Sequence, residues 1–307
     1  MPSLTAPLSH WGVIRAVGAD AAKFLNGQLT QDVQSLGHSE ARLAGYCSPK
    51  GRLLASFVIW RPSDDEVLMA CHASVLPATL KRLSMFVMRA QCKLRDASAE
   101  VSLFGVSGTE AHVATQDLPT WGQRTDDHGA WIRLPEVAGI ARAWRVMNAT
   151  TAQAADPHAL SAWQRLEVDS GIVTIEAATV DQFVPQMLNF ELIGAVNFQK
   201  GCYPGQEVVA RSQYRGTTKR RTLLFAAEAP ISAGQEVFHS ADPAQPAGLV
   251  ASAAPAPGAG STPLTHHALI EVKLTALDGG TLHLGAPDGA QLQRRPMPYE
   301  VLSAEAA

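Results

Sequence analysis

The chain has 307 residues, 46% of them hydrophobic, and a formal net charge of −3 at pH 7. This length predicts two or three domains rather than a single core. A charge near zero excludes a protein that binds polyanions through overall basicity. No stretch approaches the roughly twenty apolar residues of a membrane span, and the first residues lack the pattern of a signal peptide. We therefore expect a soluble cytoplasmic protein that does not contact a membrane.

Strand and helix patterns alternate as far as residue 168. Apolar runs predict strands, and apolar residues at helical spacing predict helices. We expect strands over residues 11–17, 52–60, 66–72, 101–106, 131–134 and 141–147, and helices over about 20–30, 76–87, from 109 onward and over 157–168. Because no strict rhythm of strand, helix and strand is present, the pattern predicts an α+β fold rather than a doubly wound parallel sheet.

The character of the sequence changes after Arg221. Short apolar runs separated by turn residues follow, with no helical period, and they predict strands over residues 223–226, 236–239, 248–253, 268–274 and 281–284. This pattern indicates a small all-β domain, either a barrel or a sandwich. The stretch 253–263 is rich in Ala, Pro and Gly and is typical of a mobile hairpin loop.

Of the four cysteines, one has polar neighbours. Cys47, Cys71 and Cys92 lie in apolar or strand-like stretches, and the wide spacing without a CxxC pair argues against a zinc site or a disulfide scaffold. Cys202 is flanked by glycines, with Lys200 nearby and a helix expected directly after the loop. A cation and a helix N-terminus favour the thiolate. The residues alone leave two interpretations open, a loop that presents a functional thiol or a connector whose cysteine only packs.

Two further features are candidates for ligand binding. Trp11 and Trp163 lie on different predicted elements, and flat aromatic walls suit a planar heterocycle such as a pterin, although core packing is the simpler interpretation of either one. A basic cluster could bind phosphates, nucleic acid or a polyglutamate tail, or form a solvated face. The cluster consists of Lys200, Arg211, Arg215, Lys219, Arg220 and Arg221, with Tyr203 and Tyr214 between them.

The segment around Cys202 reads KGCYPGQEVVARSQYRG, beginning at Lys200. It resembles the signature of the YgfZ family, KGCYxGQE followed by VARxxxRG. Three more segments resemble the same family, HWGVIRAVGADAAKFLNGQLTQDV, FVPQMLNFELIGAVNFQ and RRPMPYEV, at residues 10–33, 183–199 and 294–301. Members of this family are folate-binding proteins related to the T-protein, the aminomethyltransferase of the glycine cleavage system.

The resemblance implies a T-protein-like ring of three domains around a central folate site. Residues 1–45 plus 101–219 would form a discontinuous folate-binding α+β domain, residues 46–100 an inserted α+β domain, and residues 220–307 a C-terminal β-barrel domain. Family tryptophans that line the folate pocket match Trp11 and Trp163. Asp169 stands where relatives commonly carry a glutamate that hydrogen-bonds the pterin.

The resemblance also implies a function. It assigns Cys202 as the functional thiol, within a motif formed by Lys200, Gly201, Tyr203, Gly205, Gln206, Glu207 and Arg211. Catalytic T-proteins carry an aspartate pair where this chain has Ala55 and Ser56, and neither of these residues can act as a general base. We therefore expect a tetrahydrofolate-binding accessory protein, rather than an enzyme, that supports the assembly or repair of iron–sulfur enzymes, including those of tRNA modification.

A single thiol is too few for a stable cluster, so any iron–sulfur cluster on Cys202 would be transient and shared with a client or assembly protein. We expect no other metal site. The alternative to an accessory protein is a folate-dependent aminomethyl transferase, which the missing acids at positions 55 and 56 argue against. A third reading, direct RNA binding through the basic cluster, is not expected because the rest of the chain is not basic.

Overall fold

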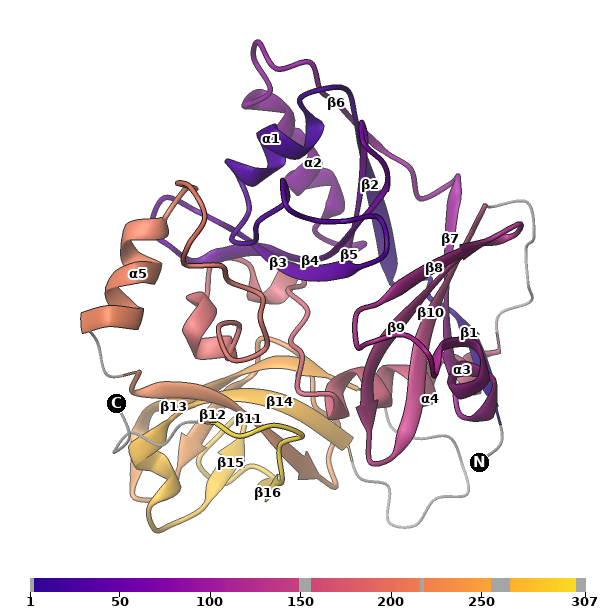
Figure 1. Cartoon of the computed structure of the whole chain (residues 1–307). Coiled ribbons are helices and arrows are strands. Elements are labelled where there is room, and N and C mark those ends of the chain that lie inside the picture. The colour runs from indigo at the N-terminus through magenta and orange to yellow at the C-terminus, as the bar shows by residue number, and fades with distance from the viewer. Residues whose placement is uncertain (1–2, 149–155, 216–217, 255–265, 302–307) are drawn as a thin grey trace.

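The computed structural model describes residues 3–148, 156–215, 218–254 and 266–301, which form three sheets (Figure 1). The first sheet has the antiparallel order β3-β4-β5-β2-β6. Its strands are β2 (Trp11–Val17), β3 (Ala41–Cys47), β4 (Leu53–Ser63), β5 (Glu66–His72) and β6 (Lys93–Asp96). Helices α1 (Ala21–Asn26) and α2 (Leu76–Met85) pack on one face of this sheet.

The side chains of β4 alternate between two cores. Phe57 and Ile59 pack with residues of α1 and α2, whereas Val58 and Trp60 belong to a core shared with the second sheet. All four side chains are buried. The continuous apolar run of this strand is therefore explained by burial on both faces of the sheet, with successive residues pointing to opposite sides.

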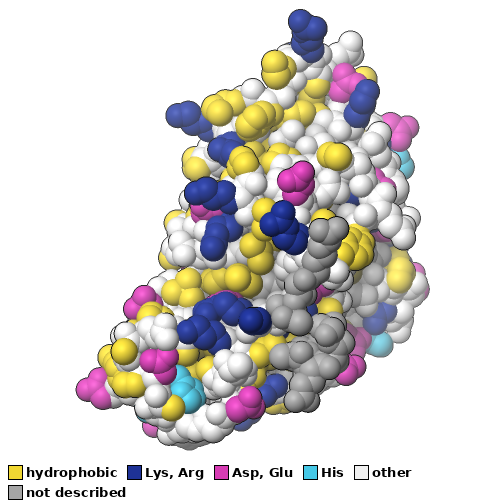
Figure 2. Space-filling model, turned by 90° about the vertical axis from the view of Figure 1, so that its left-hand side faces the viewer, with side chains coloured by type: hydrophobic (Ala, Val, Ile, Leu, Met, Phe, Trp, Pro, Cys, Tyr) yellow, Lys and Arg dark blue, Asp and Glu magenta, His cyan; other side chains and the backbone are white. Residues whose placement is uncertain are grey.

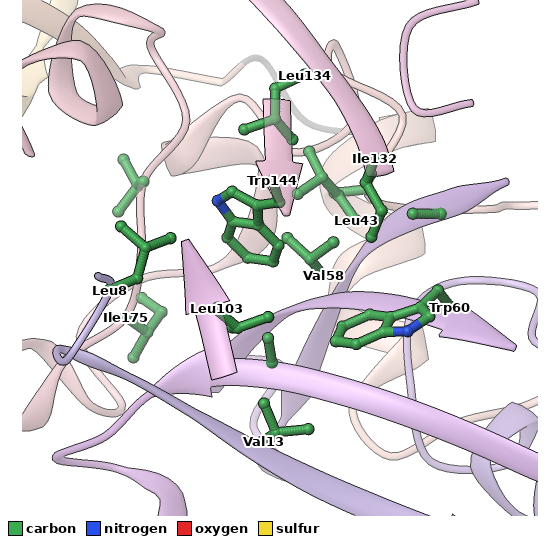
Figure 3. Close-up of a cluster of buried hydrophobic side chains, with 14 of the residues drawn as sticks. Leu8, Val13, Leu43, Val58, Trp60, Leu103, Ile132, Leu134, Trp144 and Ile175 are labelled. Atoms are coloured by element: carbon green, nitrogen blue, oxygen red, sulfur yellow. The ribbon is translucent and has the colours of Figure 1, made fainter. Parts of the chain in front are cut away.

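The second sheet has the antiparallel order β1-β7-β10-β9-β8. Its strands are β1 (Leu4–Pro7), β7 (Val101–Ser107), β8 (Gln123–Asp126), β9 (Gly129–Val137) and β10 (Ile140–Asn148), and helices α3 (Thr109–Thr115) and α4 (Pro157–Asp169) pack against it. Figure 3 shows side chains of the two sheets where they meet, Leu103, Ile132, Leu134 and Trp144 from the second sheet and Val13, Val58 and Trp60 from the first. The largest core of the described residues therefore lies between two domains.

A long connection with short 3₁₀ turns η1 (Ala177–Thr179) and η2 (Pro185–Leu188) leads to helix α5 (Gln206–Arg215) and then to the barrel. The barrel is closed in the order β11-β14-β13-β12-β15-β16. Its strands are β11 (Arg220–Ala227), β12 (Glu236–His239), β13 (Asp242–Ala253), β14 (His266–Lys273), β15 (Leu282–Leu284) and β16 (Gln291–Arg295), with the turn η3 (Leu274–Leu277) between β14 and β15. It has its own hydrophobic core.

The predicted α+β class with a C-terminal β-barrel is confirmed. The predicted domain limits need a correction, because the boundary at residues 45 and 46 falls inside β3, and β2 and β3 pair with β4 and β5 from the other side of it. Sheet pairing places residues 11–96 in one unit. The predicted loop 253–263 lies largely outside the described residues. No helix in the described part of the chain is long and apolar enough to cross a membrane.

Candidate functional site

A pocket lies where the first two sheets and the end of α4 come together. Its cavity volume is about 40 Å³, and the space between its atoms is about 510 Å³ when the part open to solvent is included. Most of its lining is apolar or aromatic, and includes Trp11, Leu43, Val58, Trp121, Trp144 and Phe190. Few polar side chains reach it, chiefly Arg142 and Glu167. A largely apolar pocket with a few placed polar groups is the usual form of a small-molecule site.

Glu167 is the carboxylate of this pocket, and three ring nitrogens bind it. The indole nitrogens of Trp11 and Trp163 donate to Oε1 at 2.9 and 2.8 Å, and His10 Nε2 lies 2.8 Å from Oε2. Burial alone would raise the pKa of Glu167, but the charge of His10 and the hydrogen bonds of all three rings hold that pKa below its ordinary value. The ionised carboxylate accepts from all three rings, which leaves one free lone pair on Oε2.

Two buried donors of the same pocket have no hydrogen-bond partner among the described residues. These are Nε of Arg142 and Nε1 of Trp144, whose side chains are almost completely buried. Arg142 donates from Nη1 to the Leu166 carbonyl at 3.0 Å, and its guanidinium lies 5.2 Å from the centre of the Trp163 ring. Burial lowers the pKa of Arg142 to about 10, so it remains a cation at neutral pH. An unpaired buried donor costs about 1–3 kcal/mol, so both atoms favour a ligand that offers acceptors.

A more polar chamber adjoins the pocket and shares Glu167, Ile172 and Thr174 with it. His10 and His72 line this chamber with ring centres 6.2 Å apart, together with Glu176. Burial lowers the pKa of His72 and raises the pKa of Glu176, so both environments favour the uncharged forms. On its other side the central pocket shares Leu43 and Trp121 with an outer pocket that reaches Asn197.

The structure separates the three residues predicted to bind folate. Trp11 lines the pocket and is partly exposed. Trp163 is fully buried beneath it, packed so closely against Gly105 that a Cβ there would clash with the indole ring. Asp169 is not among the lining residues and binds Arg165 and His267 instead. Asp169 follows Glu167 by two residues, so its side chain leaves the helix at roughly 200° from that of Glu167 and faces the barrel.

The two positions that replace the aspartate pair are both buried on β4. Ala55 is fully buried in the core beneath α1 and α2. Ser56 lines the pocket, and its hydroxyl accepts a hydrogen bond from the Ile175 amide at 2.9 Å. Neither side chain brings a titratable group to the pocket, which leaves Glu167 as the carboxylate among the lining residues.

Cys202 is the exposed cysteine, whereas Cys47, Cys71 and Cys92 are buried. Burial raises the thiol pKa of Cys47 and Cys71 to about 12 and that of Cys92 to about 11, so these three stay protonated at neutral pH. Cys202 lies in the loop just before α5, which begins at Gln206. None of the residues that line the central pocket belongs to this loop.

The motif residues around Cys202 hold the loop in place. The Lys200 ammonium donates to the carbonyls of Asn26 and Leu29 and lies 4.8 Å from the centre of the buried Tyr203 ring. Burial lowers the pKa of Lys200 to about 8. Its backbone amide donates to Asn197 Oδ1 at 3.1 Å, so the loop is joined to a residue of the outer pocket. Lys200 therefore serves as an anchor whose charge points away from solvent.

Gly205 is the position where this loop requires glycine. Its φ is +80°, and a Cβ would lie 2.7 Å from the Gly51 Cα and clash with the Ser48 carbonyl. The loop thus packs directly on the turn between β3 and β4. Gly201 has open space around it and needs no such conformation. Of the other motif residues, Gln206 is partly buried, and Glu207 and Arg211 are exposed on α5.

The predicted basic cluster does not form one surface. Arg220 binds Glu271, and the buried Arg221 binds Glu191. Arg211, Lys219 and Tyr214 are exposed, and the side chain of Arg215 lies outside the described part. The basic residues that lie close together in the sequence are therefore divided between structural ion pairs and an exposed helix face.

The residues that supply the polar groups of the pocket were not predicted from the sequence. They are Glu167, His10, Arg142 and Trp144. The spacing of Trp163 and Glu167, four residues apart on one helix face, was the available signal for their contact. No group of three or more His, Cys, Asp or Glu side chains is placed to hold a metal ion in the ranges that the structure describes.

The chain is similar to known proteins in both sequence and fold. The family model described as "GCVT N-terminal domain" matches residues 6–147. The chain is 31% identical over 244 residues to the tRNA-modifying protein YgfZ of Enterobacter sp. (strain 638), covering 75% of this chain and 73% of that protein. Its fold is similar to the glycine cleavage system aminomethyltransferase T from Bartonella henselae, with a TM-score of 0.71, 16% identity, and coverage of 95% of this chain and 84% of that chain. The expected T-protein-like fold is thereby confirmed.

Proposed function

The chain belongs to the YgfZ family, and from this premise we propose that it is a tetrahydrofolate-binding accessory protein for the assembly or repair of iron–sulfur enzymes, including those of tRNA modification. Cys202 is its functional thiol. The observation that carries the proposal is the central pocket, in which Glu167 accepts from three rings and two of the lining residues, Arg142 and Trp144, have buried donors without a partner.

The polar groups of the pocket fit the pterin end of a folate. A pterin carries N–H donors on its amino-pyrimidine edge and acceptors at its oxo group and ring nitrogens. The free lone pair of Glu167 Oε2 suits one of the donors, and Nε of Arg142 and Nε1 of Trp144 suit the acceptors. Trp11 and Trp121 supply flat walls for the ring. The match supports a ligand that is planar, apolar on its faces and polar at its edge.

The same pocket argues against aminomethyl transfer. Such a reaction needs a carboxylate that holds the amine or moves a proton at the one-carbon unit. Ala55 and Ser56 provide none, and Glu167 is already committed to three hydrogen bonds. The pocket is therefore suited to binding a folate rather than to turning it over in this way.

Cys202 supplies chemistry that the pocket lacks. It is an exposed thiol beside α5, and thiolate sulfur is a preferred ligand of iron in iron–sulfur clusters. One thiol can only share a cluster with a partner protein. The outer pocket shares Leu43 and Trp121 with the central pocket and includes Asn197, which accepts from the Lys200 amide, so these contacts link the central pocket to the loop.

The test separates the two parts of the proposal. Tetrahydrofolate should bind the purified protein, and Cys202→Ser should retain that affinity because the thiol does not line the pocket. In cells lacking the endogenous factor, Cys202→Ser should fail to restore iron–sulfur enzyme activity, while Cys92→Ser serves as the matched control and should restore it. If Cys202→Ser restores iron–sulfur enzyme activity, the thiol is not needed for the function. If the purified protein does not bind tetrahydrofolate, the proposed ligand is wrong.

A further inference from the structure

Most of the large apolar side chains that are exposed in the described part of the chain lie on two segments, and the Cys202 loop directly precedes one of them, helix α5. Seven large hydrophobic side chains are exposed in the described part of the chain. Five of them lie on two segments, the end of α2 with the following loop and helix α5. These five are Met85, Phe86, Met88, Val208 and Tyr214, and Met88 and Tyr214 are 87% and 71% exposed. Scattered apolar residues are ordinary on a surface, whereas a group of them marks an interaction site.

Contacts at the two ends of α1 link these segments. Asp20, at the start of α1, accepts a hydrogen bond from the Gln91 amide at 2.8 Å, so the loop after α2 lies against that end of α1. At the other end of α1, the Asn26 carbonyl receives the Lys200 ammonium of the Cys202 loop. That loop in turn packs through Gly205 on the turn 48–52, which contacts α5. We call this surface, formed by α1, turn 48–52, residues 85–92, the Cys202 loop and α5, the docking face.

The docking face is basic although the whole protein is slightly acidic. Residues 21–26, 48–52, 85–92 and 206–214 contain five Lys and Arg residues and one acid, Glu207, against a net charge of −3 for the chain. Lys23, Lys50, Arg89 and Arg211 are exposed. Figure 2 shows the side of the molecule that carries α5, where basic side chains are distributed from the top of the molecule to the barrel with apolar side chains between them.

We propose that this docking face binds a protein partner whose own surface is acidic at the rim and apolar at the centre, and that it thereby brings the partner to Cys202. Methionine, aromatic residues and arginine are the residue types enriched in protein–protein interfaces, and methionine adapts to different partner surfaces. The positive face of an otherwise acidic protein selects an acidic partner and steers its approach. The apolar side chains of Met85, Met88 and Val208 cannot hydrogen-bond phosphates, so they favour a protein partner over an RNA partner.

The identity of the partner rests on the proposed function, whereas the surface itself is argued from exposure and charge alone. The probe is therefore a purified iron–sulfur enzyme of tRNA modification whose activity falls in cells lacking this protein. Its affinity is measured for the wild-type protein, for Phe86→Ser with Met88→Ser, and for Tyr214→Ser. Val113→Ser is the matched control, because Val113 is 62% exposed on α3, outside the docking face.

Both docking-face variants should bind the enzyme at least tenfold more weakly, as expected when an interface anchor is removed, and Val113→Ser should bind as the wild type does. Arg211→Glu should weaken binding more at low salt than at high salt. Tetrahydrofolate affinity should be unchanged in every variant, which separates failure of this inference from failure of the folate proposal. If the docking-face variants bind the enzyme as tightly as the wild type does, the inference is wrong. If the same variants instead lose binding to purified tRNA, the face binds RNA and the inference is also wrong.

Discussion

Replacing Glu167 by glutamine removes one charge from the centre of the pocket and keeps the side chain's size. The amide oxygen can still accept from both indoles, but the amide nitrogen now faces His10, where the carboxylate accepted at 2.8 Å. A hydrogen bond to a charged group contributes about 1.5–3 kcal/mol and a neutral one about 0.5–1.5 kcal/mol. Part of this loss is offset because a buried carboxylate no longer has to be desolvated. We therefore expect the free energy of unfolding to fall by only about 1–2 kcal/mol.

Folate affinity should fall much more than stability. The free lone pair on Oε2 is replaced by an N–H group, so the ligand loses a charge-assisted acceptor and meets a donor. A loss of about 3 kcal/mol corresponds to roughly a hundredfold weaker binding. Isothermal titration with tetrahydrofolate measures the affinity, and urea unfolding measures the stability. Unchanged affinity in Glu167→Gln, with the fold intact, would refute the placement of the pterin edge at this carboxylate.

Four further outcomes follow from the same contacts. Native protein should react with a thiol reagent at Cys202, and the other three cysteines should react only after unfolding, because they are buried; mass spectrometry of the labelled peptides checks this. Gly205→Ala should lower the unfolding free energy by at least about 1 kcal/mol because its φ is +80° and a Cβ would clash, whereas Gly201→Ala, in open space, should be nearly neutral in the same denaturation assay. Trp163→Phe should destabilise the fold by about 1–3 kcal/mol, since a donor to Glu167 is lost and a smaller ring leaves space, as thermal unfolding would show. The stabilisation that comes from ionised Glu167 should be complete above its ordinary pKa of 4.5 and be lost as the pH falls through its lowered folded-state pKa; acid unfolding of Glu167→Gln, which should lack this part of the transition, tests the assignment.

Local patterns were sufficient for most of the architecture. The strand over 11–17, the hairpin of β4 and β5, helix α4 and five of the six barrel strands were predictable because each has a clear apolar period or a turn signal of its own, whereas β16 was not predicted. Which strands pair with each other could not be predicted from local patterns. Pairing of β2 with β5 depends on contacts between residues some fifty positions apart, which a local period does not encode.

The site was less predictable because its residues come together from distant segments. Trp11 and Trp163 were identified by the family resemblance, but their roles differ. Trp11 lines the pocket, whereas Trp163 is fully buried and donates a hydrogen bond to Glu167. The assignment of Asp169 followed its position in the sequence, whereas helix geometry turns it toward the barrel. The role of the basic run stayed open for a related reason, because Arg221 binds Glu191, which lies thirty residues earlier in the chain.

We propose that a folate binds between the first two sheets with its pterin edge on Glu167. A crystal structure of the protein with tetrahydrofolate tests this claim most directly. We expect the pterin in the pocket lined by Trp11 and Trp144, with an N–H group within hydrogen-bonding distance of Glu167 Oε2, and with pterin acceptors within hydrogen-bonding distance of Nε of Arg142 and Nε1 of Trp144. A pterin bound elsewhere, or in this pocket with Glu167 unengaged and both donors unpaired, would contradict it.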